Sequence, residues 1–218
     1  MINLKVNKII KFLLISDLIF WAGWGLVSPI FSVFIVLYIQ GGNSFVASMA
    51  AAIYYVLFAV LRVPMGLYLD GKRSQRADYA FTLTGFLIAS VVSFGFIFAT
   101  LPWHIYILQV AHTIGLTMNF AGFSGLFTRN LEKGRESTTQ GIDGTLVSIG
   151  GAISAVIGGL LTEHYGYYGF QLVFILVGML GLLGSVALLF IRNDLEKNTG
   201  RGLYFNIRDL MQRGEGQN

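Results

Sequence analysis

The stretch RVPMGLYLDGKRSQR, residues 62–76, separates two long apolar runs and decides how the chain folds. It interrupts the apolar pattern with Gly66 and Asp70 and then adds a group of basic residues. Hydrophobic residues make up 55% of the 218 residues, charged residues only 12%, and the mean hydropathy is +0.67. Charges that gather in short clusters between long apolar runs are typical of membrane-spanning helices.

Six apolar runs are each long enough to cross a hydrocarbon core of about 30 Å at 1.5 Å per helical residue. They cover residues 12–39, 45–69, 79–99, 103–127, 139–162 and 168–191. The first run is too long for the core of a signal peptide, so we expect it to be retained. The sequence therefore predicts an all-α integral membrane domain over residues 1–192, followed by a cytoplasmic tail over residues 193–218.

The basic residues fall on one side of the predicted spans. Fourteen of the fifteen Lys and Arg residues lie before the first span, in 70–78, in 129–138 or after residue 191, and Arg62 is the exception. Lys and Arg near span ends stay on the cytoplasmic side. We therefore expect a multi-pass protein of the inner or plasma membrane with both termini in the cytoplasm. The net charge of +4 then reflects topology and lipid contact, and no nucleic-acid partner is expected.

The tail carries Leu203, Ile207, Leu210 and Met211 on one helical face, which fits either a short amphipathic helix on the membrane surface or a frayed polar tail. The chain has no cysteine, and its three histidines lack the spacing of metal ligands. Neither a nucleotide-binding loop nor a catalytic triad is recognisable. We therefore expect no enzyme activity, no metal and no cofactor.

The loop after the second span resembles the signature loop of the major facilitator superfamily, whose usual form is G-x-L-a-D-R-x-G-R-R. Gly66, Leu69 and Asp70 match, and Tyr68 stands where the family has Leu. Gly71 replaces the first Arg, and the remaining basic residues are displaced to Lys72, Arg73 and Arg76. Asp70 and these bases could latch two helix ends and act as a cytoplasmic gate. The alternative is a topology signal with an incidental acid.

A second resemblance lies in the fifth span, where family antiporters carry G-x8-G-x3-G-P-x2-G-G. This chain has glycines in register at four of those positions, with Ser154 and Ala155 in place of the central Gly-Pro; the four are Gly141, Gly150, Gly158 and Gly159. We expect these glycines to pack helices closely. The family's proton-coupling Arg in the fourth span would fall near Ala111, beside His112. The resemblance implies a fold of two inverted three-helix repeats and a transport function.

The family usually has twelve spans in two halves, and this chain supplies one half. The resemblance implies a secondary transporter that works by alternating access, either as a homodimer or with a complementary six-helix half. The alternative is a six-helix membrane protein that transports nothing, such as an assembly partner, a regulator or a truncated relative.

Two polar stripes at helical spacing mark the candidate site for a small-molecule substrate or ion. The first span carries Asp17, Trp21 and Trp24, and the fourth carries Gln109, His112 and Asn119. Polar groups inside a membrane face protein or water, so they mark either a binding site or satisfied structural contacts. Asp17 could instead pair with a basic residue near the cytoplasmic interface, and the indoles could anchor that interface.

Two more charged residues lie near cytoplasmic span ends. Arg62 is expected to pair with Asp143 or Asp70 and to support the gate, or to extend towards the headgroups. Pro29 and Pro64 are candidate hinges in the first two spans.

Overall fold

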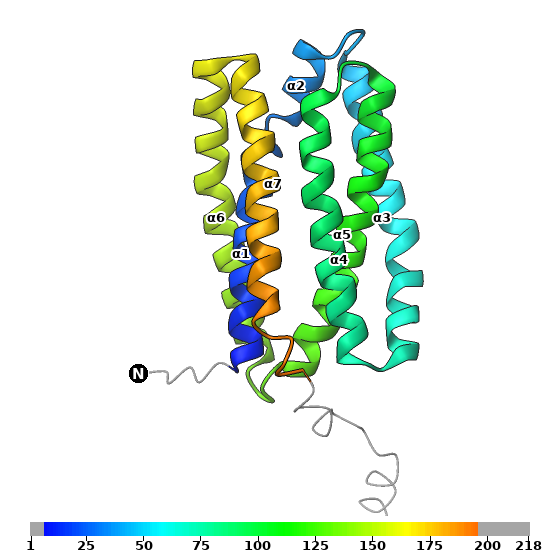
Figure 1. Ribbon diagram of the computed structural model, residues 1–218, viewed down its shortest axis with the longest axis vertical. Coiled ribbons are helices and arrows are strands. Elements are labelled where there is room, and N and C mark those ends of the chain that lie inside the picture. The colour runs from blue at the N-terminus through cyan, green and yellow to red at the C-terminus, as the bar shows by residue number, and fades with distance from the viewer. Residues whose placement is uncertain (1–6, 196–218) are drawn as a thin grey trace, which may run out of the picture.

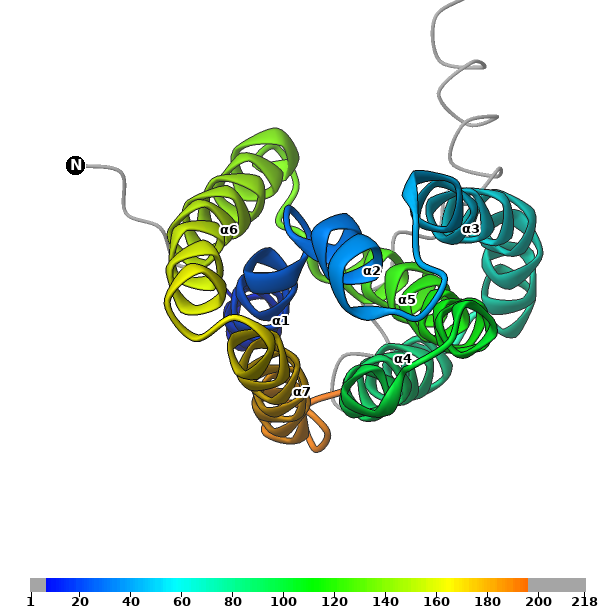
Figure 2. The ribbon, with the colours of Figure 1, turned by 90° about the horizontal axis from the view of Figure 1, so that it is seen from above.

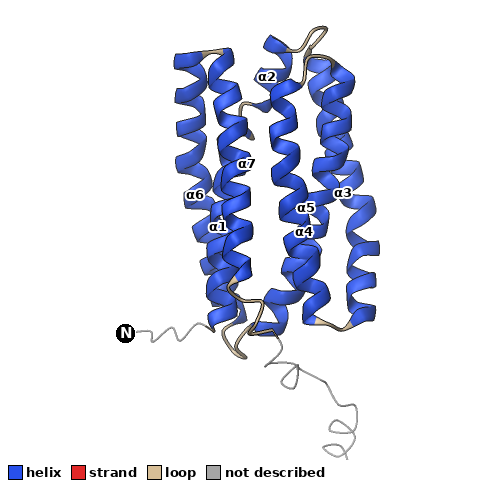
Figure 3. Ribbon diagram, in the orientation of Figure 1, coloured by secondary structure: helices blue, strands red, loops and turns tan. Residues whose placement is uncertain are grey.

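The computed structural model describes residues 7–195, and every regular element within that range is a helix (Figure 3). In chain order the helices are α1 (Lys8–Val27), α2 (Phe31–Tyr38), α3 (Ser44–Lys72), α4 (Gln75–Gly95), the 3₁₀ turn η1 (Phe96–Phe98), α5 (Pro102–Asn130), α6 (Glu136–Tyr165) and α7 (Tyr167–Leu189). The amphipathic helix predicted in the tail lies outside the described residues.

The long helices run side by side along one axis (Figure 1). Residues near the two ends of the described chain meet at one end of this bundle, where Lys8 Nζ lies 2.8 Å from Asp194 Oδ2. We call this end the basic end, because the helix termini and links located there carry Lys8, Lys72, Arg73, Arg76, Arg129, Lys133, Arg135 and Arg192.

The predicted span over residues 12–39 corresponds to the apolar segment Lys8–Tyr38, within which the structure has two helices. Pro29 has no backbone N–H and cannot continue the hydrogen-bond ladder of α1. The chain turns over Ser28–Ile30, where the Ile30 N–H donates to the Val27 carbonyl, and α2 begins at Phe31. Pro64 behaves differently, since α3 runs through it without a break.

Five helical segments are long and apolar enough to cross a membrane. They are Lys8–Tyr38, which contains both α1 and α2, Ser44–Lys72, Gln75–Phe98, Glu136–Tyr165 and Tyr167–Leu189. The remaining long helix, α5, has 29 residues, as many as α3, but it carries more polar side chains. Its polarity is the feature that connects the fold to the candidate site.

The helices pack as two linked groups, seen end-on in Figure 2. In one group α1 contacts α6 and α7, and in the other α5 contacts α3 and α4. Contacts between α4 and α7 join the two groups. The helices α3 and α6 lie at opposite edges of the bundle (Figures 1 and 2).

Two glycines let neighbouring backbones touch. A Cβ atom at Gly85 on α4 would overlap the backbone nitrogen of Asn119 on α5, and one at Gly158 on α6 would overlap the Leu26 carbonyl oxygen on α1. Small residues permit such close approach where membrane helices gain little from hydrophobic burial. The α4–α5 contact places Asn119 inside the bundle.

Candidate functional site

The polar stripe predicted on the fourth span lies inside the bundle. Gln109, His112 and Asn119 on α5 are 4%, 1% and 3% exposed. Each holds a buried polar atom with no hydrogen-bond partner in residues 7–195, namely Oε1, Nδ1 and Nδ2 in that order. Unpaired polar atoms in an apolar interior are costly, and they are uncommon in folded proteins.

Other buried polar side chains of α5 form hydrogen bonds to carbonyls of their own helix. Thr113 Oγ1 donates to the Gln109 carbonyl at 2.7 Å, and Thr117 Oγ1 donates to the Thr113 carbonyl at 2.7 Å. A hydroxyl that bonds back to its own helix needs no further partner. The two threonines therefore have hydrogen-bond partners within α5. Gln109, His112 and Asn119 each keep a polar atom that can still bond another molecule.

Aromatic rings from two other elements hold the His112 imidazole. The Trp24 indole of α1 stacks on it with ring centroids 4.6 Å apart and planes 23° apart. The Phe96 ring of η1 meets it edge-on at 6.4 Å. The predicted residues Trp24 and His112 are therefore in direct contact, which fixes the orientation of the imidazole ring.

The second part of the candidate site surrounds Asp17 on α1. Its carboxylate is buried, and Oδ1 accepts a hydrogen bond from Trp21 Nε1 at 3.1 Å. Asp17 precedes Trp24 by seven residues, so it lies about 10 Å further along the same face of α1. Asp143 on α6 is half-buried, acts electrostatically on Asp17, and has an unpartnered Oδ1. Within the described chain neither carboxylate has a Lys or Arg nitrogen within 4.0 Å.

Arg62 on α3 contacts rings and not an acid. Its guanidinium carbon lies 3.9 Å from the centre of the Phe120 ring on α5 and 5.4 Å from that of Phe58. These are cation–π contacts. Over residues 7–195 no carboxylate oxygen lies within 4.0 Å of the guanidinium, so the structure differs from the predicted pairing with Asp143 or Asp70.

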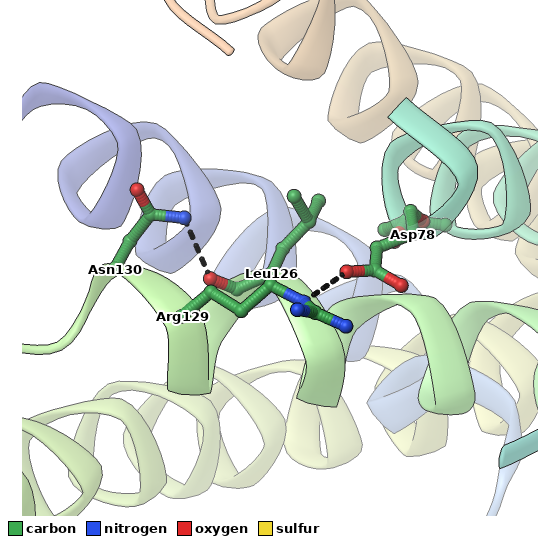
Figure 4. Close-up of polar contacts among 5 residues, drawn as sticks. Asp78, Leu126, Arg129 and Asn130 are labelled. Carbon is green, nitrogen blue, oxygen red and sulfur yellow. Dashed lines mark hydrogen bonds and ion pairs between the residues drawn. The ribbon is translucent and has the colours of Figure 1, made fainter. Parts of the chain in front are cut away.

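An ion pair that the sequence did not reveal joins α4 and α5 near the basic end. Arg129 Nε lies 2.8 Å from Asp78 Oδ2, and Figure 4 shows the guanidinium reaching across to the buried carboxylate. Gly125 leaves room for this carboxylate, because a Cβ there would lie 2.8 Å from Asp78 Cγ. In the sequence, Asp78 and Arg129 lie in the polar links 70–78 and 129–138. The available signal was an acid and a base at the facing ends of consecutive spans.

No three His, Asp or Glu side chains in the described part of the chain gather closely enough to hold a metal ion. The chemistry available there is hydrogen bonding by amide and imidazole groups, charge and aromatic stacking.

A family model described as the Major Facilitator Superfamily matches residues 13–203. The chain belongs to this superfamily. The resemblance drawn from the signature loop is thereby confirmed, and membership together with the apolar helices identifies a multi-pass membrane protein of a transporter family. No curated protein matches the chain significantly.

The superfamily's signature loop is mostly helical in this chain. α3 continues to Lys72, Arg73 takes a left-handed backbone conformation (φ 47°), and α4 begins at Gln75. Asp70 is exposed and has no ion pair within 4.0 Å among residues 7–195, while Lys72 Nζ lies 5.5 Å from the centre of the Tyr68 ring. Apart from chain neighbours and the backbone of α3 itself, no atom of residues 7–195 lies within 4 Å of where a Cβ at Gly66 would be. The gating role of this loop, Arg76 included, stays a prediction.

The superfamily's fifth-span glycines divide between two faces of α6. A Cβ at Gly150 would lie 2.7 Å from Leu18 Cδ1 of α1, and Gly158 abuts the same helix. Apart from chain neighbours and the backbone of α6 itself, no atom of the described chain lies within 4 Å of where a Cβ at Gly141 or Gly159 would stand. Two of the four predicted packing glycines therefore face α1, and two face away from it.

Proposed function

We propose that the chain is a secondary transporter, built as a six-span half, that moves a small polar solute across the membrane by alternating access between two assembled halves. The energy source is a solute or ion gradient. The superfamily match supports the general class, and the polar stripe of α5 supports the site.

The observation that carries the proposal is the set of unpaired buried atoms on Gln109, His112 and Asn119. Within residues 7–195 these atoms have no partner, so burying them is costly unless a polar molecule bonds them during the working cycle. An amide oxygen, an imidazole nitrogen and an amide NH₂ offer both acceptors and donors. Such a set suits a neutral or zwitterionic solute with hydrogen-bonding groups.

Asp17 and Trp21 form the second wall of the proposed site. Their hydrogen bond orients the carboxylate, which would bind a proton, a cation or the cationic group of the solute. Because Trp24 already stacks on His112, its role in this proposal is to position the imidazole.

The helix contacts support a fold of two inverted three-helix repeats. When α1–α2, α3 and α4 are matched in order with α5, α6 and α7, the contact of α1 with α6 corresponds to that of α5 with α3. The contact of α1 with α7 corresponds in the same way to that of α5 with α4. In this proposal α5 also crosses the membrane, which brings the number of spans to six. The concentration of Lys and Arg at the basic end supports cytoplasmic placement of both termini.

Transporters of the superfamily are built from two six-span halves, and their substrate sites lie near the midplane between repeats. A second six-span body is therefore part of the proposal, and a second copy of this chain is the simplest source.

The test is flux through vesicles that contain the purified chain, using solutes first selected because they raise its thermal stability. Asn119→Leu and His112→Phe are expected to abolish saturable flux. Thr117→Val is the matched control on the same helix, since its hydroxyl bonds only the chain's own carbonyl, and it should retain flux. Equal flux in all three variants would refute the assignment of the site.

A further inference from the structure

Arg62 is a charged side chain inside a span, and it has no role in the site described so far. It lies ten residues before the end of α3 at Lys72, which places it about 15 Å from the basic end. A charged side chain at such a depth is costly in hydrocarbon, and residues of this kind are typical of substrate and ion pathways. A partner of opposite charge is therefore expected for it.

Aromatic rings hold the Arg62 guanidinium in place. Its central carbon lies 3.9 Å from the centre of the Phe120 ring on α5 and 5.4 Å from that of Phe58. The Phe58 and Phe120 rings meet edge-on at 5.7 Å. Ring faces attract the cation but offer no oxygen to its five N–H donors. Within residues 7–195 no hydrogen-bond acceptor or carboxylate pairs with the guanidinium, so its donors are available to a ligand.

The rings also show that this side chain does not extend to the headgroups. Phe120 is ten residues before the end of α5 at Asn130, which is again about 15 Å from the basic end. A hydrocarbon core is about 30 Å thick, so this depth is close to its centre when the basic end lies at one interface. Phosphate groups of lipids lie outside that core. The geometry therefore favours an anion that arrives from water.

Arg62 and Phe120 lie on the side of α5 that is turned away from α4. Tyr68, six residues after Arg62 and therefore about 120° from it around α3, stacks on Phe81 of α4. Asn119 packs against α4, and Phe120 is about 100° further around α5. Figure 2 shows α4 and α7 together on one side of the bundle, with α3 and α6 at the edges of the other. The guanidinium therefore faces the side that α3 and α6 flank.

We propose that Arg62 binds an oxyanion of the transported solute, a carboxylate or a phosphate group, while the rings of Phe58 and Phe120 support the guanidinium. The inference rests on the proposed function and narrows the solute from polar to anionic or zwitterionic. A planar guanidinium binds such a group through two parallel N–H···O bonds, which an ammonium cannot form. Asp17 is nine residues after the start of α1, about 14 Å from the basic end, so a zwitterion would find an acid at the same depth.

Phenylglyoxal, which modifies accessible arginine side chains, tests the site in the wild-type chain. The protein is placed in nanodiscs of phosphatidylcholine, and labelling is followed by peptide mass spectrometry as sodium acetate or phosphate is added at constant ionic strength. We expect both anions to protect Arg62 with saturation, and acetamide, the neutral analogue of acetate, to give no protection. Arg73, an exposed arginine at the basic end, is the internal control and should be labelled equally throughout. Equal labelling of Arg62 with and without the anions would overturn the proposal, as would a guanidinium that the reagent cannot reach.

A second set of nanodiscs, with phosphatidylglycerol added, separates a solute from a lipid as the source of the oxyanion. We expect this lipid alone to leave Arg62 open to labelling. Protection by phosphatidylglycerol, with none by acetate or phosphate, would assign the site to a lipid headgroup and overturn the solute assignment.

Variants test the parts of the site through the dependence of the Tm on acetate concentration. Arg62→Gln should lose the acetate-dependent rise in Tm. Arg62→Lys should bind acetate about tenfold more weakly, because one hydrogen bond to a charged group is lost. Phe120→Leu should weaken binding by about 2–5-fold, the contribution of an exposed cation–π contact. Lys133→Gln, an exposed change in the link between α5 and α6, is the control and should bind like the wild type. Equal acetate affinity in Arg62→Gln and the wild type would contradict the assignment.

The result can be separated from that of the proposed function. Protection of Arg62 without flux of any stabilising solute would support the oxyanion site and count against transport. Saturable flux that is unchanged in Arg62→Gln, together with no protection by acetate or phosphate, would overturn the oxyanion site and leave the transporter intact.

Discussion

The buried ion pair between Asp78 and Arg129 gives the sharpest test of how α4 and α5 are held together at the basic end. The Asp78 side chain is 1% exposed and the Arg129 side chain is 29% exposed. Replacing Arg129 with Met leaves a carboxylate that cannot reach water. Replacing Asp78 with Asn leaves a guanidinium that can extend to the headgroups. The two substitutions should therefore have unequal effects.

Removing one member of a buried pair costs about 3–5 kcal/mol when the remaining charge stays buried. We assign that range to Arg129→Met. We assign about 1.5 kcal/mol to Asp78→Asn, at the lower end for a lost hydrogen bond to a charged group. For chains of 150–250 residues, 1 kcal/mol shifts the Tm by about 2–4 °C, so even 3 kcal/mol lowers it by about 6–12 °C.

The assay is thermal unfolding of the purified variants in one detergent, followed by tryptophan fluorescence. The double variant Asp78→Asn/Arg129→Met should be more stable than Arg129→Met alone, because no charge is left buried. Glu132→Gln is the control, since its contact with Arg135 is exposed and 3.7 Å long, and should change stability by less than about 1 kcal/mol. A larger loss for Asp78→Asn than for Arg129→Met, or no recovery in the double variant, would refute the reasoning.

Four further substitutions have definite expected outcomes. Gly85→Ala should cost about 1–3 kcal/mol by forcing α4 away from α5, whereas Gly144→Ala, with nothing within 4 Å, should leave the Tm of the purified chain nearly unchanged. Trp21→Phe removes the hydrogen bond to Asp17 and should lower the free energy of unfolding by about 1 kcal/mol, measured by denaturant titration. Pro29→Ala should join α1 to α2, so spin labels placed on either side should move apart to the separation of a continuous helix; unchanged label distances would count against Pro29 as the cause of the break.

The membrane character of the fold was predictable, because long apolar runs have few alternatives to helices in lipid. The stripe at Gln109, His112 and Asn119 was predictable too, since helical periodicity alone assigns residues to a face. Spacing does not reveal which residue of another helix meets that face. The contact between Trp24 and His112 depends on where α1 crosses α5, and no local pattern encodes that crossing.

Two further features required the three-dimensional arrangement. The helix break lies at Pro29, whereas α3 continues through Pro64, although both prolines lie in apolar runs. A proline leaves a backbone carbonyl of the preceding turn without its N–H donor, and the surroundings decide whether that carbonyl finds another partner. Asp78 and Arg129 are 51 residues apart, so their contact follows from the packing of α4 on α5. The sequence motif points to the basic residues of the signature loop, but the buried ion pair joins α4 and α5.

In the proposed mechanism, the polar stripe of α5 binds the solute that crosses the membrane. The most direct measurement is the initial rate of uptake into vesicles containing only this polypeptide, for a solute that stabilises it, with Asn119→Leu measured in parallel. We expect saturable uptake by the wild-type chain and loss of that uptake in the variant. Equal, non-saturable rates in wild-type, variant and protein-free vesicles would contradict it.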